Sequence, residues 1–533
     1  MKITELEPKQ LWANFASLNA VPRPSKKEEK VIAFMVAFGK SLGLDTYQDE
    51  TGNVIIKKPA SAGMENRKTV VLQSHLDMVH QKNNDTVFDF STEGIKMLID
   101  GDWVRADGTT LGADNGIGVA SIMAILQSKD IAHPAIEALF TIDEETGMTG
   151  AKGLKGGLLS GAYLLNLDTE EDDEIDIGCA GGVDVSAFRE YDTILTPTEA
   201  VAYTLSVKGL HGGHSGMDIH KGYANANKLM NRLLFTCSEK FDLHIAEING
   251  GGLRNAIPRE SVAIITVDKN EKEAFEKEIA QLTCDLQHEY AVTEPTLNVL
   301  LSPTALPERV MEIEEQEDVL RAIYAAFNGV YKMSQSIADL VETSNNIARV
   351  ELKNGEINVY CLTRSASETS KYDLADTIRA AFELAGFEVE YTGSYPGWEP
   401  KVDAEILKIV KEQYETLFGE TPQVVACHAG LECGILGTNY PTMEMVSFGP
   451  TIKGAHSPAE RVNIASVQKF WKFLLSILKN IPAKYLVIRF LNKNNYLRSN
   501  ILIASQVVFY FDIRKLFLFI KFFILPLHPI YKE

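Results

Sequence analysis

The sequence contains few cysteines, and they are not arranged in pairs. Six occur among 533 residues, at positions 179, 237, 284, 361, 427 and 433. No CxxC motif is present, which excludes a cysteine zinc knuckle and gives no sign of a disulfide framework. The N-terminal sequence MKITELEPKQLW also lacks the basic and then apolar pattern of a secretory signal, so we expect a cytoplasmic protein.

Basic residues are also in deficit. Lys and Arg number 52 against 72 Asp and Glu, which gives a formal net charge of -20. Such an acidic chain argues against a nucleic-acid partner, because nucleic acids favour basic surfaces. The contents of hydrophobic residues (45%) and charged residues (23%) are those of a globular protein with a core.

Residues 485–533 differ from the rest of the chain. They hold seven Lys or Arg and two acids, a net charge of +5. Their best apolar run, residues 516–527, is interrupted by Lys521 and is shorter than the ~20 residues that a spanning helix needs. We interpret the segment as an atypical extension that the body of the protein does not require, and we expect no membrane partner. Attachment to an anionic surface through its basic and aromatic residues is the alternative.

A chain of this length predicts two or more domains. Residues 1–186 alternate amphipathic helical segments with short apolar runs such as TVVLQS (69–74), and residues 396–484 return to this pattern. Residues 187–395 instead interleave strand-like runs with acidic amphipathic helices. The predicted fold class is therefore α/β. We expect a mixed, mostly parallel sheet with helices on both faces, interrupted by an inserted α+β lid domain.

Potential metal ligands follow four of the strand-like runs. Because sites in open α/β sheets form beyond the carboxyl ends of strands, we expect these side chains at one edge of the sheet. They are His75 and Asp77 after TVVLQS, Glu144 and Glu145 after AIEALFTI, Asp168 after YLLNL, and His456 in the loop after MEMVSFG; Asp114, in LGADNG before a predicted helix, is a further candidate.

Two histidines and several carboxylates suit zinc, with manganese or cobalt as alternatives. The set is large enough for two divalent ions if one carboxylate bridges them, and ions roughly 3.5–4 Å apart can together activate a water and polarise a carbonyl. Asp77 could orient the imidazole of His75, two residues before it. Glu144 and Glu145 would point in different directions, so that one could bind metal while the other acts as a base.

Each of these residues also has a structural interpretation. A lone His or Asp at a strand end is more often a turn or cap residue, the sequence Asp114-Asn-Gly can be a simple turn, and Glu144 and Glu145 can lie in a solvated loop. The coincidence of ligand types at four strand ends favours the functional interpretation.

At these positions the sequence resembles the metallopeptidase family of aminoacylases, carnosinases and cytosolic dipeptidases. The matching stretches span residues 1–484 in the family's order: SHLDMV, DGTTLGADNGIGVA, LFTIDEETGMTGA, LLNLDTEE, GLHGGHSG, GLRNAIPRE, ACHAGLECG and GPTIKGAHSPAERV. The resemblance implies one ion held by His75, Asp114 and Asp168. It implies a second ion held by Asp114, Glu145 and His456, with Asp114 bridging. It also makes Glu144 the general base and Asp77 the partner of His75.

The resemblance implies roles for the inserted domain as well. His214 of GGHSG would approach the scissile carbonyl, although His211 lies in the same glycine-rich run. Asn255 and Arg364 would hold the substrate carbonyl or carboxylate. Further expectations are a cis peptide bond between Asp114 and Asn115, hinges near residues 181–182 and 396–397, and a homodimer through the inserted domain.

The implied function is hydrolysis of short peptides. Asp168, where several deacylase and carboxypeptidase relatives carry Glu, fits the dipeptidase branch of the family. Arg364 would suit a free carboxylate one residue beyond the cut. A preference for Xaa-His dipeptides, including carnosine-like substrates, is implied by the resemblance alone. Two alternatives are an N-acyl amino acid hydrolase of the same fold and a metal-binding scaffold without turnover; the intact Glu144 argues against the scaffold.

Overall fold

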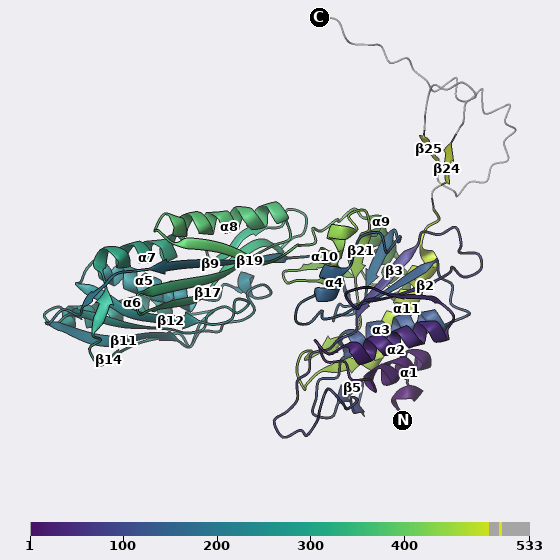
Figure 1. Ribbon diagram of the computed structural model, residues 1–533, viewed down its shortest axis with the longest axis horizontal. Coiled ribbons are helices and arrows are strands. Elements are labelled where there is room, and N and C mark those ends of the chain that lie inside the picture. The colour runs from purple at the N-terminus through teal and green to yellow at the C-terminus, as the bar shows by residue number, and fades with distance from the viewer. Residues whose placement is uncertain (1, 485, 490–499, 504–533) are drawn as a thin grey trace, which may run out of the picture.

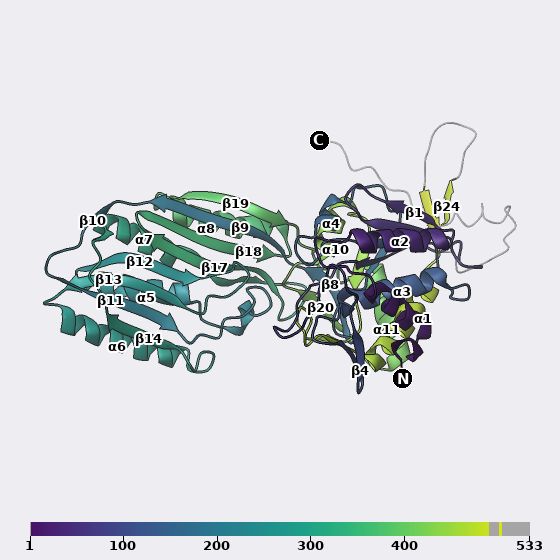
Figure 2. The same ribbon diagram turned by 60° about the horizontal axis from the view of Figure 1, so that its bottom comes forward.

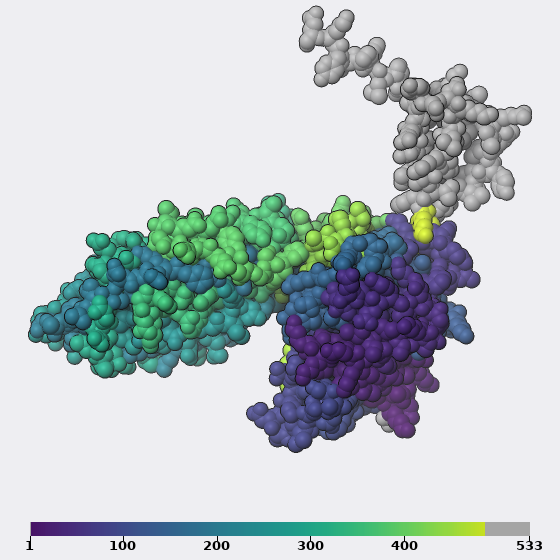
Figure 3. All heavy atoms as spheres, in the orientation of Figure 1, coloured from purple at the N-terminus to yellow at the C-terminus, as the bar shows by residue number. Residues whose placement is uncertain are grey.

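The computed structural model describes residues 2–484, 486–489 and 500–503. Two lobes are visible (Figures 1 and 3), and one of them is built from segments far apart in the sequence. The purple and blue N-terminal elements share this lobe with yellow-green elements near the C-terminal end, whereas the teal and green elements form the other lobe. The chain therefore leaves the first domain, builds the second one and returns.

An eight-stranded mixed sheet forms the centre of the first lobe. Its spatial order is β1 (Asp45–Gln48), β2 (Val54–Lys58), β6 (Ile136–Thr141), β3 (Val70–His75), β7 (Tyr163–Asn166), β21 (Glu444–Ser447), β8 (Glu174–Cys179) and β20 (Gln423–Cys427). Strands β6, β3, β7 and β21 are parallel neighbours, as are β8 and β20. The other pairs, β1–β2, β2–β6 and β21–β8, are antiparallel. β3, β6 and β7 are buried along their whole length, which explains their continuous apolar runs.

Helices cover both faces of this sheet. One face packs against α1 (Lys9–Asn19), α2 (Glu29–Ser41), α3 (Ala113–Gln127), α9 (Glu405–Phe418) and α11 (Ile464–Asn480) through the largest apolar cluster of the described residues. The other face packs against α4 (Thr149–Gly153) and α10 (Glu432–Asn439). Smaller elements complete the lobe: the 3-10 helix η1 (Ile3–Glu5) and a sheet of β22 (Ile452–Lys453), β23 (Arg461–Asn463), β5 (Trp103–Ala106) and β4 (Met97–Asp100). The predicted α/β fold class is thus confirmed (Figure 2).

A large antiparallel sheet forms the centre of the inserted domain. Its order is β14 (Asn298–Pro303), β11 (Ala200–Lys208), β13 (Ser261–Asp268), β12 (Leu243–Gly251), β17 (Val341–Lys353), β18 (Glu356–Ser365), β9 (Gly181–Glu190) and β19 (Glu388–Tyr395), with β16 (Gly329–Met333) beside β17. Four helices pack on it: α5 (Ala226–Ser238), α6 (Lys272–Glu289), α7 (Ile313–Ala325) and α8 (Glu368–Glu383). A separate apolar cluster joins helices and sheet. The remaining elements are β10 (Thr193–Leu195), β15 (Arg309–Met311) and the 3-10 helix η2 (Ile219–Lys221).

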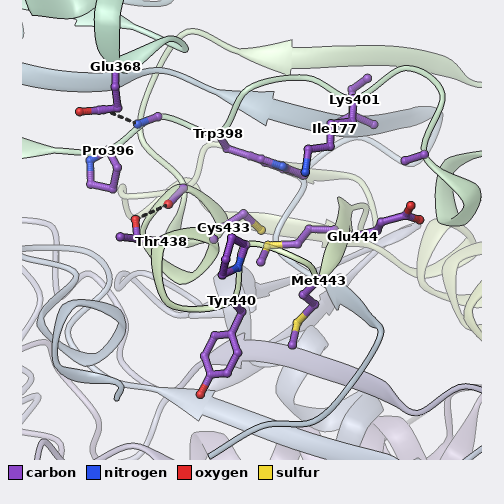
Figure 4. A pocket seen from close by; sticks show the side chains of 16 residues that line it. Ile177, Glu368, Pro396, Trp398, Lys401, Cys433, Thr438, Tyr440, Met443 and Glu444 are labelled. Carbon is purple, nitrogen blue, oxygen red and sulfur yellow. Dashed lines mark hydrogen bonds between the residues drawn. The ribbon is translucent and has the colours of Figure 1, made fainter. Parts of the chain in front are cut away.

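The connection between the lobes lies at Gly181 and at the segment 395–398. β9 already belongs to the insert's sheet, so the insert begins at Gly181 and not at 187, because the apolar pattern of this strand continues across the expected boundary. On the return, the backbone N–H groups of Cys179 and Trp398 each donate to the other residue's carbonyl at 2.9 Å. A cavity of about 270 Å³ lies at this junction, lined by Trp398, Glu368 of α8 and residues of α10 and 440–445 (Figure 4).

Beyond Lys484 the structure describes only β24 (Leu486–Arg489) and β25 (Asn500–Ile503), which pair antiparallel. The rest of the predicted extension lies outside the described residues. Within the described part of the chain, no helix combines the length and the apolar character needed to cross a membrane.

Candidate active site

The predicted ligands come together at the carboxyl ends of the central parallel strands. His75 is the last residue of β3, and the segments that hold Glu145 and Asp168 directly follow β6 and β7. Asp114 lies in the first turn of α3, and His456 lies between β22 and β23. Because β6, β3 and β7 are adjacent and parallel, their ends deliver these side chains to one edge of the sheet.

Asp114 lies between the two histidines. Its Oδ1 is 3.2 Å from Nε2 of His75, and its Oδ2 is 3.1 Å from Nε2 of His456. Each histidine nitrogen also approaches a second carboxylate: His75 is 3.4 Å from Oδ1 of Asp168, and His456 is 3.0 Å from Oε2 of Glu145. These contacts divide the five residues into two groups of three that share Asp114.

This donor set fits divalent metal ions. Ligand atoms of His75, Asp114 and Glu145 all lie within 4.8 Å of one another. The buried Oε1 of Glu145 has no hydrogen-bond partner in the structure, so it is free to bind a cation. Histidine nitrogens and carboxylate oxygens are the ligands that zinc, cobalt and manganese share, so the geometry does not distinguish among these metals.

The carboxylates and histidines of the cluster shift one another's pKa values. Burial opposes ionisation of Asp114, yet its hydrogen bonds with His456 and His75 hold the pKa of this carboxyl well below its usual range. Hydrogen bonds with Asp114 and Glu145 raise the pKa of His456 to about 11. Burial raises the pKa of Glu145. Bound divalent cations would compete with protons for the same carboxylates and imidazoles.

Asp77 connects His75 to the segment that carries Glu144. Its Oδ1 is 3.3 Å from Nδ1 of His75 and accepts the backbone N–H of Glu144 at 3.0 Å. Its Oδ2 accepts the hydroxyl of Ser25 at 2.8 Å and the backbone N–H of Glu145 at 3.3 Å. Burial raises the pKa of Glu144 well above its usual range. No hydrogen bond or ion pair joins the Glu144 side chain to the ligand residues in the described structure, which leaves this carboxyl available as a base.

Two charged residues that the sequence analysis missed hold the Asp114 loop in place. Glu460 accepts the backbone N–H groups of Leu111 at 2.7 Å, Gly112 at 3.0 Å and Ala113 at 2.7 Å. The buried Arg23 donates to the carbonyls of Asp77 at 3.0 Å and Gly112 at 2.5 Å. Gly112 has a φ of +68°, and a Cβ there would lie 2.5 Å from Arg23, so only glycine fits this turn. The peptide bond between Asp114 and Asn115 is cis, as predicted.

The three residues assigned to the inserted domain make no described polar contact with this cluster. Within the described residues, no hydrogen bond or ion pair connects His214, Asn255 or Arg364 to the five predicted ligands. Nδ1 of His214 accepts the backbone N–H groups of Gly216 at 3.2 Å and Met217 at 3.1 Å. The loops of His214 and Asn255 are adjacent, because the N–H of Ser215 donates to the Asn255 carbonyl at 2.8 Å.

Arg364 lies on β18, and one nitrogen of its guanidinium group makes no hydrogen bond in the structure. Its Nη1 donates to the hydroxyl of Tyr395 at 2.9 Å, whereas its buried Nε has no hydrogen-bond partner in the structure. Positive charge on Arg364 also contributes to lowering the pKa of His214 below its usual value, after the larger effect of burial. His214 and Arg364 therefore lie close together, at the end of the insert that meets the catalytic domain.

His428 and Glu432 are two further residues that the sequence analysis did not single out, although both lie in the ACHAGLECG stretch. His428 is buried against the insert and contacts Ser344 of β17 through Nε2. Glu432 is fully buried at the start of α10 and accepts hydrogen bonds from Gln73 and Thr141. In the sequence, His428 and Glu432 stand out only because a His and a Glu are unusual among the small residues of this stretch.

Comparison with known proteins agrees with this geometry. Residues 71–480 match the model of peptidase family M20/M25/M40. The chain is 43% identical over 483 residues to the cytosol non-specific dipeptidase of Escherichia coli, covering 91% of this chain and 100% of that protein. It is 44% identical to the aminoacylhistidine dipeptidase of Vibrio alginolyticus, whose crystal structure superposes with a TM-score of 0.87 over 91% of this chain and 99% of that one. Aminopeptidase PepT of Bacillus cereus, at 17% identity and a TM-score of 0.53 over 89% of this chain and 99% of that one, shares the fold. The chain therefore belongs to peptidase family M20/M25/M40 and is a peptide-bond hydrolase, as its motifs predicted.

Proposed function

We propose that this protein is a dipeptidase that uses two divalent metal ions. The observation that carries the proposal is the position of Asp114, whose two oxygens face His75 and His456 at 3.2 and 3.1 Å. His75, Asp114 and Asp168 would hold one ion, and Asp114, Glu145 and His456 would hold the other. When bound, the two ions would supply Lewis acidity and lower the pKa of a bound water.

The protein's own residues would move the proton. Glu144 accepts it from the attacking water and passes it to the leaving amine. Asp77 fixes the imidazole of His75 and, through the backbone N–H of Glu144, the position of the base. Burial raises the pKa of Glu144, which suits a group that has to hold a proton between its two transfers.

The inserted domain would supply substrate recognition. His214 would stabilise the developing oxyanion, while Asn255 and Arg364 would bind the substrate carbonyl and carboxylate. The unpartnered Nε of Arg364 supports this assignment, because a bound carboxylate would satisfy it. No described hydrogen bond or ion pair joins these residues to the proposed ligands, and we propose that the insert closes on the substrate, with hinges at 181–182 and 396–397.

We propose aminoacyl-histidine dipeptides as substrates, because relatives at 43% and 44% identity are named as a dipeptidase and an aminoacylhistidine dipeptidase. The name of the first relative also supports a cytosolic location. Zinc is the metal we expect, with cobalt and manganese as alternatives, and a homodimer through the insert remains a prediction.

Release of free amino acid from Ala-His, β-Ala-His and N-acetylalanine tests this proposal. The assay uses the full chain loaded in turn with zinc, manganese or cobalt. Hydrolysis of the two dipeptides, with little release from N-acetylalanine, is the expected result. Preference for N-acetylalanine would instead identify an N-acyl amino acid hydrolase. Metal binding without release from any of the three compounds would favour the scaffold.

A further inference from the structure

A row of buried polar side chains lies directly beneath the metal cluster. Gln73 precedes His75 by two residues, and Asn166 precedes Asp168 by two residues. Thr141 precedes the segment Asp143–Glu144–Glu145 in the same way. Because side chains two apart in a strand share a face, these three residues form the layer below the ligands on the α10 side of the sheet.

Hydrogen bonds link this layer across neighbouring strands. The amide of Gln73 on β3 accepts from Asn166 on β7, and Asn166 in turn accepts from Ser447 on β21. The hydroxyls of Ser447 and Thr169 are 2.8 Å apart, and Thr169 lies 2.9 Å from Oδ2 of Asp176 on β8. At the other end, Nε2 of Gln73 donates to Glu432 at 2.7 Å.

The bonding pattern gives the row a direction that ends on Glu432. Ser447 donates its hydroxyl to Asn166, and Thr169 donates its hydroxyl to Asp176. Asn166 then donates to Gln73, and Gln73 donates to Glu432. Glu432 is therefore the final acceptor of the chain that starts at Ser447.

Glu432 joins the two strands that carry the proposed ligand His75 and the proposed base Glu144. Its Oε2 accepts from Gln73 of β3 at 2.7 Å and from the hydroxyl of Thr141 of β6 at 2.6 Å. Gln73 also donates to Thr141 at 3.1 Å, which closes a triangle between the strands. Glu432, Gln73 and Thr141 are all fully buried.

Apolar side chains would have been sufficient to fill this space. The positions two residues earlier on the same strands, Val71, Leu139 and Leu164, are packed apolar residues of the cluster beneath α4 and α10. A polar layer is costly to bury, and its hydrogen bonds have preferred lengths and directions that apolar contacts lack. The hydrogen-bonded layer can therefore fix the distances between neighbouring strands, and it lies directly next to the proposed metal ligands.

We propose that Glu432 is a positioning residue, whose contacts with Gln73 and Thr141 set the spacing between the metal ligand His75 and the base Glu144. The proposal rests on the function proposed above. Gln has nearly the same shape as Glu and keeps an oxygen that can accept from Gln73 and Thr141. Gln at this position should therefore keep the spacing, and Leu should not.

The test compares Glu432→Gln, Glu432→Leu and Thr141→Val in the full chain loaded with cobalt. Two quantities are measured: steady-state hydrolysis of Ala-His and the visible absorption spectrum of bound cobalt, which reports ligand geometry without turnover. Thr141→Val removes one hydroxyl with little change of shape, which keeps the test usable if Glu432→Leu does not fold. Thr266→Val is the matched control, because Thr266 is buried in the insert and its hydroxyl has no partner in the structure.

We expect Glu432→Leu to lower kcat by about 10-fold to 100-fold, with KM nearly unchanged and the cobalt spectrum altered. Thr141→Val should show a smaller change of the same kind, and Glu432→Gln and Thr266→Val should resemble the unmodified protein. Normal kcat and cobalt spectra in both Glu432→Leu and Thr141→Val would overturn the proposal. An equal loss in Glu432→Gln and Glu432→Leu would also overturn it, since charge and not spacing would then matter. If the unmodified protein hydrolyses no dipeptide, the proposed function fails, and the cobalt spectra alone decide the role of Glu432.

Discussion

Ser344 of the inserted domain and His428 of the catalytic domain form a buried hydrogen bond, with 2.8 Å between Oγ and Nε2. The loop of His214 packs on the same point, since a Cβ at Gly216 would lie 2.0 Å from the His428 carbonyl oxygen. Ser344 is also the cross-strand neighbour of Arg364. His428 therefore links the insert, near the proposed recognition residues His214 and Arg364, to the segment that continues to Glu432.

Removing this contact should loosen the insert. Ser344→Ala deletes one buried hydrogen bond, worth about 1 kcal/mol, and so should shift an open–closed equilibrium about fivefold. Labels attached at Val87→Cys in the catalytic domain and Val292→Cys in the insert, both over 90% exposed, measure the distance between the domains. The exposed Cys284 is replaced first so that it does not take up label. We expect a broader distribution than in the matched control Ser302→Ala, a change at an exposed position on β14. Identical distributions would show that this bond does not hold the domains.

Acid should weaken the same contact. Burial, with help from Arg364 and His214, lowers the pKa of His428 to about 3, so the buried side chain is neutral at pH 7. For a base with a lowered pKa, the stabilisation is present above its ordinary value of about 6.5 and is lost as the pH falls towards 3. The loss is about 1.4 kcal/mol per pH unit below that value. The label distances should therefore broaden between pH 6.5 and 5 in the unmodified chain, but much less in His428→Gln, which cannot titrate. Parallel behaviour of the two proteins would exclude His428 as the cause.

The number of bound metal ions should depend on which carboxylate is changed. Asp114 faces both histidines, so Asp114→Asn should weaken both metal sites. Glu145 contacts only His456 within the cluster, so Glu145→Gln should weaken one site. Metal analysis after dialysis should give two ions per unmodified chain, about one for Glu145→Gln and fewer for Asp114→Asn. Retention of both ions by Asp114→Asn would contradict its bridging role.

A chain ending at Lys484 should fold and act normally. The segment before this residue already closes the catalytic domain: the N–H of Lys484 donates to the Asn66 carbonyl at 2.6 Å, and Arg67 donates to the Ile481 carbonyl at 2.8 Å. Every proposed site residue also precedes Lys484. Unfolding temperature, metal content and Ala-His hydrolysis should match those of the full chain. Loss of folding, or release of the shortened chain from a membrane fraction, would show that residues 485–533 have a function.

The sequence was sufficient to predict the buried strands and the meeting of histidines and acids at their ends. TVVLQS and AIEALFTI are apolar because both faces of β3 and β6 are covered, and histidines or acids directly after such runs stand out. Arg23, Glu460, Glu432 and His428 were not predicted, because each acts through partners far away in the chain. Only the folded structure brings these partners near, so the residues around each position in the sequence do not show what it binds.

The most direct test of the proposed mechanism is the hydrolysis of Ala-His by Glu144→Gln, with metal content measured on the same sample. Glu144 is assigned as the base because its side chain is not among the contacts of the five ligands, and loss of a positioned base costs roughly 10²–10⁴-fold in rate. We predict that kcat falls by at least this amount while two metal ions per chain remain bound. A near-normal kcat, or loss of a metal ion, would contradict the assignment of Glu144 as the base and Glu145 as the ligand.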